Sequence, residues 1–195
     1  MIPFPDKKYD VIYTDPPWNY YGDPNKMAAA GKHYNLMDQE ELFKLPVQDI
    51  MHKNSAMFMW ATGPRLDYAI DLIKKWGLNY RGVAYVWIKT TKQGMPFGAA
   101  GVRPTFTKPL TEFVLVASNI KTGRPLTIHT ESQRQTVFNP PTRHHSEKPE
   151  VVRQRIDELC GEVSKLEMFS RKKNIPGWDF WGNEVGKLGD LNEIR

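Results

Sequence analysis

The chain has 195 residues, of which 40% are hydrophobic and 25% are charged, a composition typical of a soluble globular domain that can bury a core. No apolar run approaches the ~18 residues of a membrane span, and the N-terminal residues lack the apolar core of a signal peptide. The single cysteine, Cys160, excludes an internal disulfide and a cysteine-based zinc cluster. We therefore expect one domain over residues 1–195 that resides in the cytoplasm and has no membrane partner.

The net charge of +5 is unevenly distributed along the chain. Residues 1–80 contain 9 Lys and Arg against 10 Asp and Glu, whereas residues 81–175 contain 16 against 8. Much of this excess lies in segments broken by proline and glycine, which suits a polyanionic partner such as a nucleic acid. A basic surface that serves only solubility explains the composition equally well.

Five short apolar segments predict strands, because they are rich in β-branched and aromatic residues and end at turn residues. These segments are 9–14, 55–62, 81–90, 111–118 and 164–170. Apolar residues at helical spacing predict helices over 64–77 and 148–161, the latter with Pro149 as its first residue. A shorter helix within 37–50 is expected to stop near Pro46. Apolar strands that alternate with helices indicate an α/β fold with a doubly wound, mostly parallel sheet.

Three long loops are predicted at 19–37, 91–110 and 121–147. Each follows a predicted strand or the hairpin between two of them. Loops of ~20 residues are uncommon in compact domains unless they are functional. Because open α/β sheets bind ligands beyond the carboxyl ends of their strands, we expect the substrate near these loops.

The first predicted strand stops at Asp15-Pro16-Pro17-Trp18. Each proline stiffens the backbone and removes a hydrogen-bond donor. An amine on a flat ring could donate one hydrogen to the Asp15 carboxylate and another to the Pro16 carbonyl, while Trp18 stacks on the ring. Holding the amine in this way would free its lone pair for nucleophilic attack. A proline-stopped strand with a capping aspartate explains the same residues equally well.

Six segments, in order, resemble the sequence blocks of one family. They are DPPW, FMWATGP, GVAYVWIKT, KPLTEFVLVAS, RHHSEKPEVVRQRIDEL and LEMFSRKKNIPGWDFWGNE. Together they resemble the DPPW-type adenine-N(6) methyltransferases, the family of the mRNA adenosine methyltransferase catalytic subunit and its bacterial and phage DNA relatives. The resemblance implies a Rossmann-like class I methyltransferase fold with one antiparallel strand and the circularly permuted motif order of the β class. It also implies S-adenosylmethionine as methyl donor, S-adenosylhomocysteine as product, and the cytoplasm of a bacterial or phage-infected cell.

The resemblance also implies a role for individual residues. Asp15 would face the methionine ammonium of the cofactor and help hold the target amine, and Lys148 would pair with the cofactor carboxylate. The other implied cofactor-binding residues are Glu167, Arg171, Asn174, Asn183 and Glu184. The implied catalytic residues are Asp15, Pro16, Pro17 and Trp18, and we expect Trp18, Tyr20, Tyr34, Lys92, Arg103 and Lys108 to bind substrate. No metal is expected, because His144 and His145 lack partners at ligand spacing.

The resemblance favours a DNA adenine-N(6) methyltransferase that is a monomer or a homodimer. Methylation of adenine in RNA is one alternative, and a catalytically inactive nucleic-acid-binding partner subunit is another. The intact signature argues against the inactive subunit, because inactive members of the family typically lose the aspartate or the aromatic residue. Lys173 stands where the eukaryotic enzyme has a histidine, which leaves the contacts to the cofactor carboxylate open.

Overall fold

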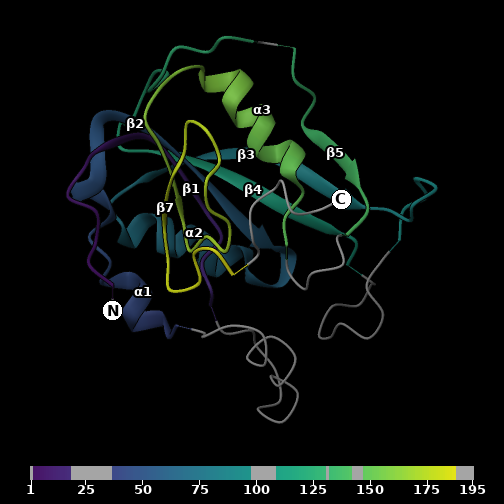
Figure 1. The fold of residues 1–195 in the computed structure, drawn as a ribbon, viewed down its shortest axis with the longest axis horizontal. Helices are drawn as coiled ribbons and strands as arrows, with labels where there is room; N and C mark the ends of the chain where they lie inside the picture. The colour runs from purple at the N-terminus through teal and green to yellow at the C-terminus, as the bar shows by residue number, and fades with distance from the viewer. Residues whose placement is uncertain (1, 19–36, 98–108, 131, 142–146, 188–195) are drawn as a thin grey trace.

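The computed structural model describes residues 2–18, 37–97, 109–130, 132–141 and 147–187. Seven strands form one sheet in the order β5-β3-β4-β2-β1-β6-β7 (Figure 1). The strands are β1 (Tyr9–Thr14), β2 (Met51–Thr62), β3 (Asn79–Lys89), β4 (Thr111–Ser118), β5 (Thr136–Asn139), β6 (Lys165–Met168) and β7 (Asp179–Trp181). β4 runs antiparallel to its neighbours β2 and β3, and the other four strand pairs are parallel. The expected α/β, mostly parallel sheet with one antiparallel strand is confirmed.

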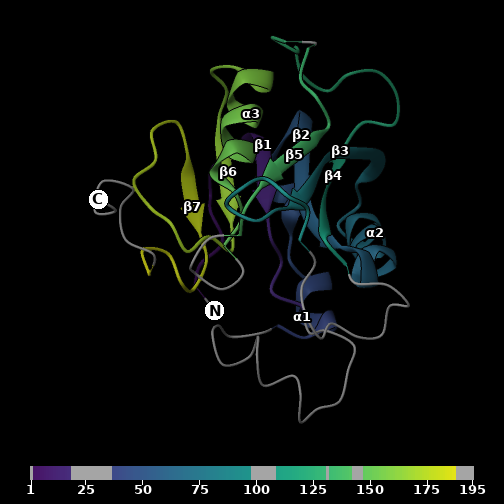
Figure 2. The ribbon, with the colours of Figure 1, turned by 90° about the vertical axis from the view of Figure 1, so that its right-hand side faces the viewer.

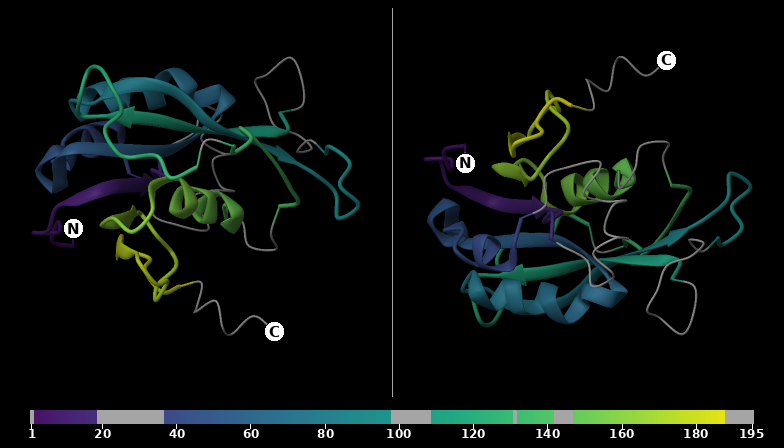
Figure 3. Two further views of the ribbon diagram at one scale, coloured as in Figure 1. Left: turned by 90° about the horizontal axis from the view of Figure 1, so that it is seen from above. Right: turned by 90° about the horizontal axis from the view of Figure 1, so that it is seen from below.

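Helices cover both faces of this sheet. The α-helices are α1 (Gln39–Phe43), α2 (Leu66–Lys75) and α3 (Glu150–Cys160), and two 3-10 turns are η1 (Val47–Ile50) and η2 (Gly63–Arg65). Figures 2 and 3 show α3 on one face of the sheet and α2 on the other. Successive residues of β1 therefore enter different cores: Ile12 packs in the core on the α2 side, and Val11 and Tyr13 in the core on the α3 side. Burial on both faces explains why the strand sequences are continuously apolar.

Two short strands were not placed by the sequence analysis. β5 lies inside the segment expected to be a loop over 121–147, and β7 lies in the C-terminal segment rich in glycine and tryptophan. They have four and three residues, too few for an apolar pattern to distinguish a strand from a loop. The helix expected within 37–50 is divided into α1 and η1, and Pro149 precedes α3 instead of opening it.

The described part of the 91–110 loop turns back along the end of β3. The Phe97 N–H donates to the Lys89 carbonyl over 2.9 Å, and the Thr91 N–H donates to the Met95 carbonyl over 2.8 Å. Among the helices of the described chain, none combines the length and the apolar character needed to cross a membrane.

Candidate active site

The DPPW stretch forms a tight turn at the carboxyl end of β1. The Trp18 N–H donates to the Pro16 carbonyl over 2.9 Å, and the Met37 N–H donates to the Pro17 carbonyl over 3.0 Å. The first bond closes a three-residue turn around Pro17, whose ring already fixes its own φ. Asp15 is thereby held just beyond the strand. The Pro16 oxygen uses one of its two lone pairs in this turn, so it retains capacity for a second donor.

The Trp18 indole lies in the core on the α2 side, where only 5% of the residue is exposed. Its ring meets Tyr68 of α2 edge to face, with centroids 5.5 Å apart and an interplanar angle of 85°. The Arg65 guanidinium covers the Tyr68 ring at 4.6 Å. A stacking role for Trp18 stays a prediction, and it requires the indole to become more accessible when substrate binds.

Asp15 belongs to a chain of ion pairs that crosses the strand ends. The Lys148 Nζ lies 3.1 Å from Asp15 Oδ2 and 3.1 Å from Glu112 Oε2, and the Lys89 Nζ lies 2.6 Å from Glu112 Oε1. Glu112 reaches this edge because β4 runs in reverse and begins where β2 and β3 end. The Lys148 ammonium also lies 5.5 Å from the centre of the Trp60 ring. Residues from the end of β1, from β2, β3 and β4, and from the segment before α3 therefore meet at one point.

The pKa values of two carboxylates in this chain of ion pairs are shifted in opposite directions. Desolvation by the surrounding protein raises the pKa of Asp15 against the opposing effect of Lys148, although 38% of its side chain stays open to solvent. Burial also acts to raise the pKa of Glu112, but Lys148 and Lys89 outweigh it and hold that pKa below its ordinary value. Glu112 is thus a fixed counterion for both lysines, while Asp15 is the more readily protonated carboxylate.

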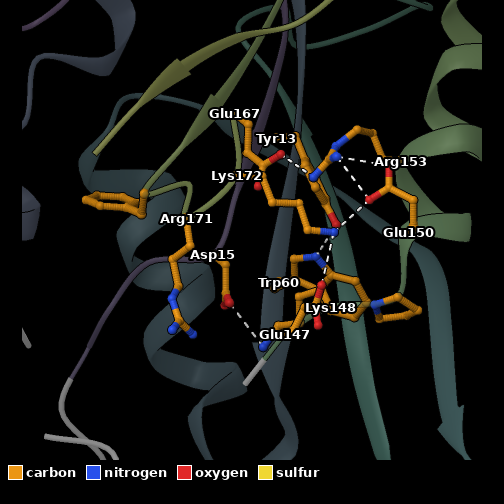
Figure 4. A pocket seen from close by; sticks show the side chains of 12 residues that line it. Tyr13, Asp15, Trp60, Glu147, Lys148, Glu150, Arg153, Glu167, Arg171 and Lys172 are labelled. Carbon is orange, nitrogen blue, oxygen red and sulfur yellow. Dashed lines mark hydrogen bonds and ion pairs between the residues drawn. The ribbon is translucent and has the colours of Figure 1, made fainter. Parts of the chain in front are cut away.

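A second network of ion pairs lies beside the first, between α3 and the end of β6. Arg153 Nη1 donates to both carboxylate oxygens of Glu150 at 2.9 and 3.0 Å, and Arg153 Nη2 pairs with Glu167. Lys172 Nζ bonds to Glu150 Oε2 at 2.9 Å and lies 3.2 Å from Glu147 Oε1. Figure 4 shows this network above the Asp15–Lys148 pair. Burial raises the pKa of Glu167, and Arg153 is the strongest influence that opposes the rise.

Residues of both networks line one pocket, which occupies about 490 Å³ when its open mouth is counted. Its lining includes four acidic and four basic side chains, namely Asp15, Glu147, Glu150, Glu167, Lys148, Arg153, Arg171 and Lys172. The Tyr13 hydroxyl accepts a hydrogen bond from Trp60 Nε1 over 2.6 Å in the same lining. Cations that alternate with carboxylates suit a ligand carrying both charges, such as the amino-acid end of S-adenosylmethionine. The residues present therefore fit that cofactor.

The C-terminal segment that carries the expected cofactor-binding residues Arg171 and Glu184 lies next to this pocket. Arg171 Nε lies 3.3 Å from Glu184 Oε2, and Glu184 also pairs with Lys187 over 2.7 Å. Gly182 has a φ of +153°, and a Cβ there would lie 2.9 Å from the Cα of Phe169. Glycine is therefore required where the β7 end passes the turn that carries Phe169 and Arg171.

The structure brings together four of the expected site residues in one pocket: Asp15, Lys148, Glu167 and Arg171. Glu184 joins them through Arg171, whereas Asn174 and Asn183 are exposed beside this segment and Lys92 is exposed after β3. Four expected substrate residues lie outside the described residues: Tyr20, Tyr34, Arg103 and Lys108. Among the side chains that the structure describes, no group of three or more His, Cys, Asp or Glu could hold a metal ion.

Several residues that line or support the pocket were not singled out from the sequence. They are Tyr13, Trp60, Glu112, Glu147, Glu150, Arg153 and Lys172. For two of them, the sequence contains a feature that could have identified them. Glu112 is an acidic residue within an apolar strand, and Arg153 occupies the same helix face as the buried Ile156 and Cys160. A charge on a buried face needs a partner, and such pairs are enriched at functional sites.

The mostly parallel seven-stranded sheet with a charged pocket at its strand ends matches the Rossmann-like fold of class I methyltransferases. The MT-A70 family model matches residues 9–184, and the chain belongs to this family. The resemblance noted in the sequence is thereby confirmed.

Named relatives extend this similarity. The type II methyltransferase M.MunI of Mycoplasma is 33% identical over 93% of this chain and 79% of its own length. The human N(6)-adenine-specific methyltransferase METTL4 is 25% identical over 93% of this chain and 38% of its own length. A Drosophila melanogaster N(6)-adenosine-methyltransferase MT-A70-like protein is 26% identical over 91% of this chain and 27% of its own length. The chain thus spans most of the bacterial relative and less than half of the animal ones.

Proposed function

We propose that this chain transfers a methyl group from S-adenosylmethionine to the exocyclic N6 of adenine in DNA. The observation that carries the proposal is the Lys148 ammonium, 3.1 Å from both Asp15 and Glu112 beside the DPPW turn. Membership of the MT-A70 family and the likeness to M.MunI and METTL4 support methyl transfer to adenine N6.

The bound cofactor would supply a methyl group activated by its positively charged sulfur. Two side chains of the protein, Lys148 and Asp15, would change their ion-pair partners when the cofactor binds. Lys148 can take the cofactor carboxylate while it stays paired with Glu112, and Asp15 would exchange the lysine for a cationic or N–H donor. A carboxylate with a raised pKa is a better proton acceptor than an ordinary aspartate. Asp15 and the Pro16 carbonyl together would hold the two hydrogens of the target amine.

Adenine in RNA is the second candidate substrate, because the name of the Drosophila relative specifies adenosine. An inactive partner subunit is the third candidate. The intact signature and the presence of Lys148 and Arg171 in the same pocket as Asp15 argue against inactivity.

The test measures transfer of tritiated methyl groups to single-stranded DNA, duplex DNA and RNA, followed by mapping of 6-methyladenine. We expect Asp15→Asn to lower the rate by about 10²–10⁴-fold, the range typical of a positioned acid or base. Asp71→Asn is the matched control, because Asp71 is an exposed aspartate in a surface pair with Lys74. Wild-type activity in the Asp15 variant would refute the assignment, and methylation of RNA alone would replace DNA by RNA.

Calorimetry separates cofactor binding from the chemical step. We expect Lys148→Met to weaken binding of S-adenosylhomocysteine by about tenfold or more, since a charged hydrogen bond contributes roughly 1.5–3 kcal/mol. Unchanged affinity would exclude Lys148 as the carboxylate partner. We further propose that the enzyme is a monomer or a homodimer. Light scattering would show these states as a mass near 22.5 kDa or twice that value. We also propose that the enzyme acts in the cytoplasm.

A further inference from the structure

The three most exposed large hydrophobic residues of the described chain lie on the two backbone segments that flank the end of β3. They are Met95, Phe138 and Phe97, which are 66%, 60% and 55% exposed. Phe97 is bonded through its backbone to Lys89, and Asn139, the neighbour of Phe138, accepts from the Thr90 N–H over 3.3 Å. We call these three side chains the strand-end patch. The other exposed large hydrophobics of the described chain are at most 39% exposed.

Met95 and Phe97 belong to a folded arm. The arm comprises residues 89–97, and backbone bonds at Thr91 and Phe97 hold its two sides together. Gly94, with a φ of +83°, makes the turn. Figures 1 and 3 show the arm in teal, projecting from the end of β3 away from the sheet. Two apolar side chains are therefore presented on an ordered projection.

The charge of this arm suits a polyanion. Residues 89–97 contain no acidic residue. Lys92 is exposed on the turn, whereas the charge of Lys89 is balanced by Glu112. Neutralising phosphates with lysine and arginine supplies much of the affinity of proteins for nucleic acid. Exposed apolar side chains next to a lysine therefore suit a nucleic acid duplex, which carries phosphates on its surface and stacked bases in its interior.

The arm also adjoins the pocket. Lys89 pairs with Glu112 over 2.6 Å, Glu112 pairs with Lys148 over 3.1 Å, and Lys148 pairs with Asp15 over 3.1 Å. The base of the arm is thus linked to Asp15 by three consecutive ion pairs along one edge of the sheet. A nucleic acid with its target base at Asp15 would pass near the strand-end patch.

We propose that the strand-end patch inserts into the base stack of duplex nucleic acid beside the target adenine. This inference rests on the proposed function. A base must leave the duplex before an enzyme can reach its amine, at a cost of a few kcal/mol. Phenylalanine and methionine wedges that enter between base steps stabilise distorted duplexes in other proteins. The patch offers these residue types at the edge where extrusion is needed.

The test compares three substrates that contain the methylation site found by mapping: the paired duplex, the same duplex with the target adenine mispaired, and the single strand. The variants are Met95→Ala/Phe97→Ala and Phe138→Ala. Tyr80→Ala is the matched control, because Tyr80 is an exposed aromatic residue at the opposite end of β3. Unchanged melting temperatures would establish that the variants fold.

We expect the patch variants to methylate the paired duplex about tenfold more slowly, the size that loss of a base-stacking contact can produce. On the mispaired duplex and the single strand, their rates should stay within about twofold of wild type, because the extrusion cost is lower there. Equal losses on all three substrates would overturn the proposal. If light scattering also showed an altered mass for the variants, the patch would be identified as a contact between copies of the protein. A wild-type enzyme active on single strands alone would overturn the wedge and leave the proposed function standing. A wild-type protein inactive on every nucleic acid would overturn both.

Discussion

Replacement of Arg153 by methionine tests whether the buried network between α3 and β6 stabilises the fold. Arg153 is only 4% exposed, and the side chain of its partner Glu167 is 13% exposed. In the variant, Glu150 keeps the Lys172 ammonium at 2.9 Å. Glu167 loses its paired cation and keeps the Ser170 hydroxyl at 3.1 Å. Breaking a buried pair from one side costs about 3–5 kcal/mol. We expect a loss near 3 kcal/mol, because only one of the two carboxylates loses its cation.

The loss should depend on pH. Burial already holds the pKa of Glu167 above its ordinary value of 4.5, and removal of Arg153 takes away the strongest opposing influence. In the variant, the folded state therefore binds a proton more readily than the unfolded state. The variant's loss of unfolding free energy is fully present above the raised folded-state pKa of Glu167. This loss shrinks as the pH falls through that pKa towards 4.5.

Urea unfolding near neutral pH and near pH 5 measures both effects. Lys74→Met is the control, since its pair with Asp71 joins side chains that are 65% and 64% exposed and should contribute less than about 1 kcal/mol. Adding Glu167→Gln to Arg153→Met should recover most of the loss, because it removes the uncompensated charge. If Arg153→Met unfolds like the control near neutral pH, or if the second substitution recovers nothing, the reasoning is wrong.

Two further predictions concern glycine and cysteine. Gly182→Ala should cost about 1–3 kcal/mol in thermal unfolding, since its Cβ would meet the Phe169 backbone at 2.9 Å. Gly123→Ala, at a φ of +76° with open space around it, should cost less, and equal losses would contradict the collision. Cys160 is 2% exposed and burial raises its thiol pKa to about 12, so the native protein should resist a thiol reagent at mildly alkaline pH while the unfolded protein reacts fully. Rapid stoichiometric labelling of the native protein would contradict that burial.

Local sequence patterns predicted the central strands well. Residues 9–14 and 111–118 match β1 and β4, because proline or turn residues bound an apolar run in each. The strands β5 and β7 escaped prediction because each is short and lies at an edge of the sheet, where pairing with a neighbour decides the conformation. In the same way, only the folded chain shows that β2 begins at Met51, since the polar residues 52–55 separate Met51 from the apolar run of the strand.

The site could be predicted in part. The meeting of Asp15 with Lys148 followed from a resemblance, because no local pattern relates residues so far apart in the chain. The role of Arg153 depends on Glu167, a partner on another element. Glu112 pairs with Lys148 only because β4 runs in the reverse direction. The buried position of Trp18 against Tyr68 likewise depends on how α2 packs. Such features arise from tertiary contacts between segments whose local sequences are unrelated.

The reversal of β4 has a consequence for how substrate preference could diverge among related enzymes. Because β3 ends and β4 begins at the same edge, the segment between them leaves and re-enters the sheet at one point, where the Lys89 N–H donates to the Leu110 carbonyl over 2.8 Å. The entropic cost of closing a loop rises only slowly with its length. Insertions and deletions between these two residues therefore leave the strands in register, and evolution can change the length and sequence of this segment without altering the core.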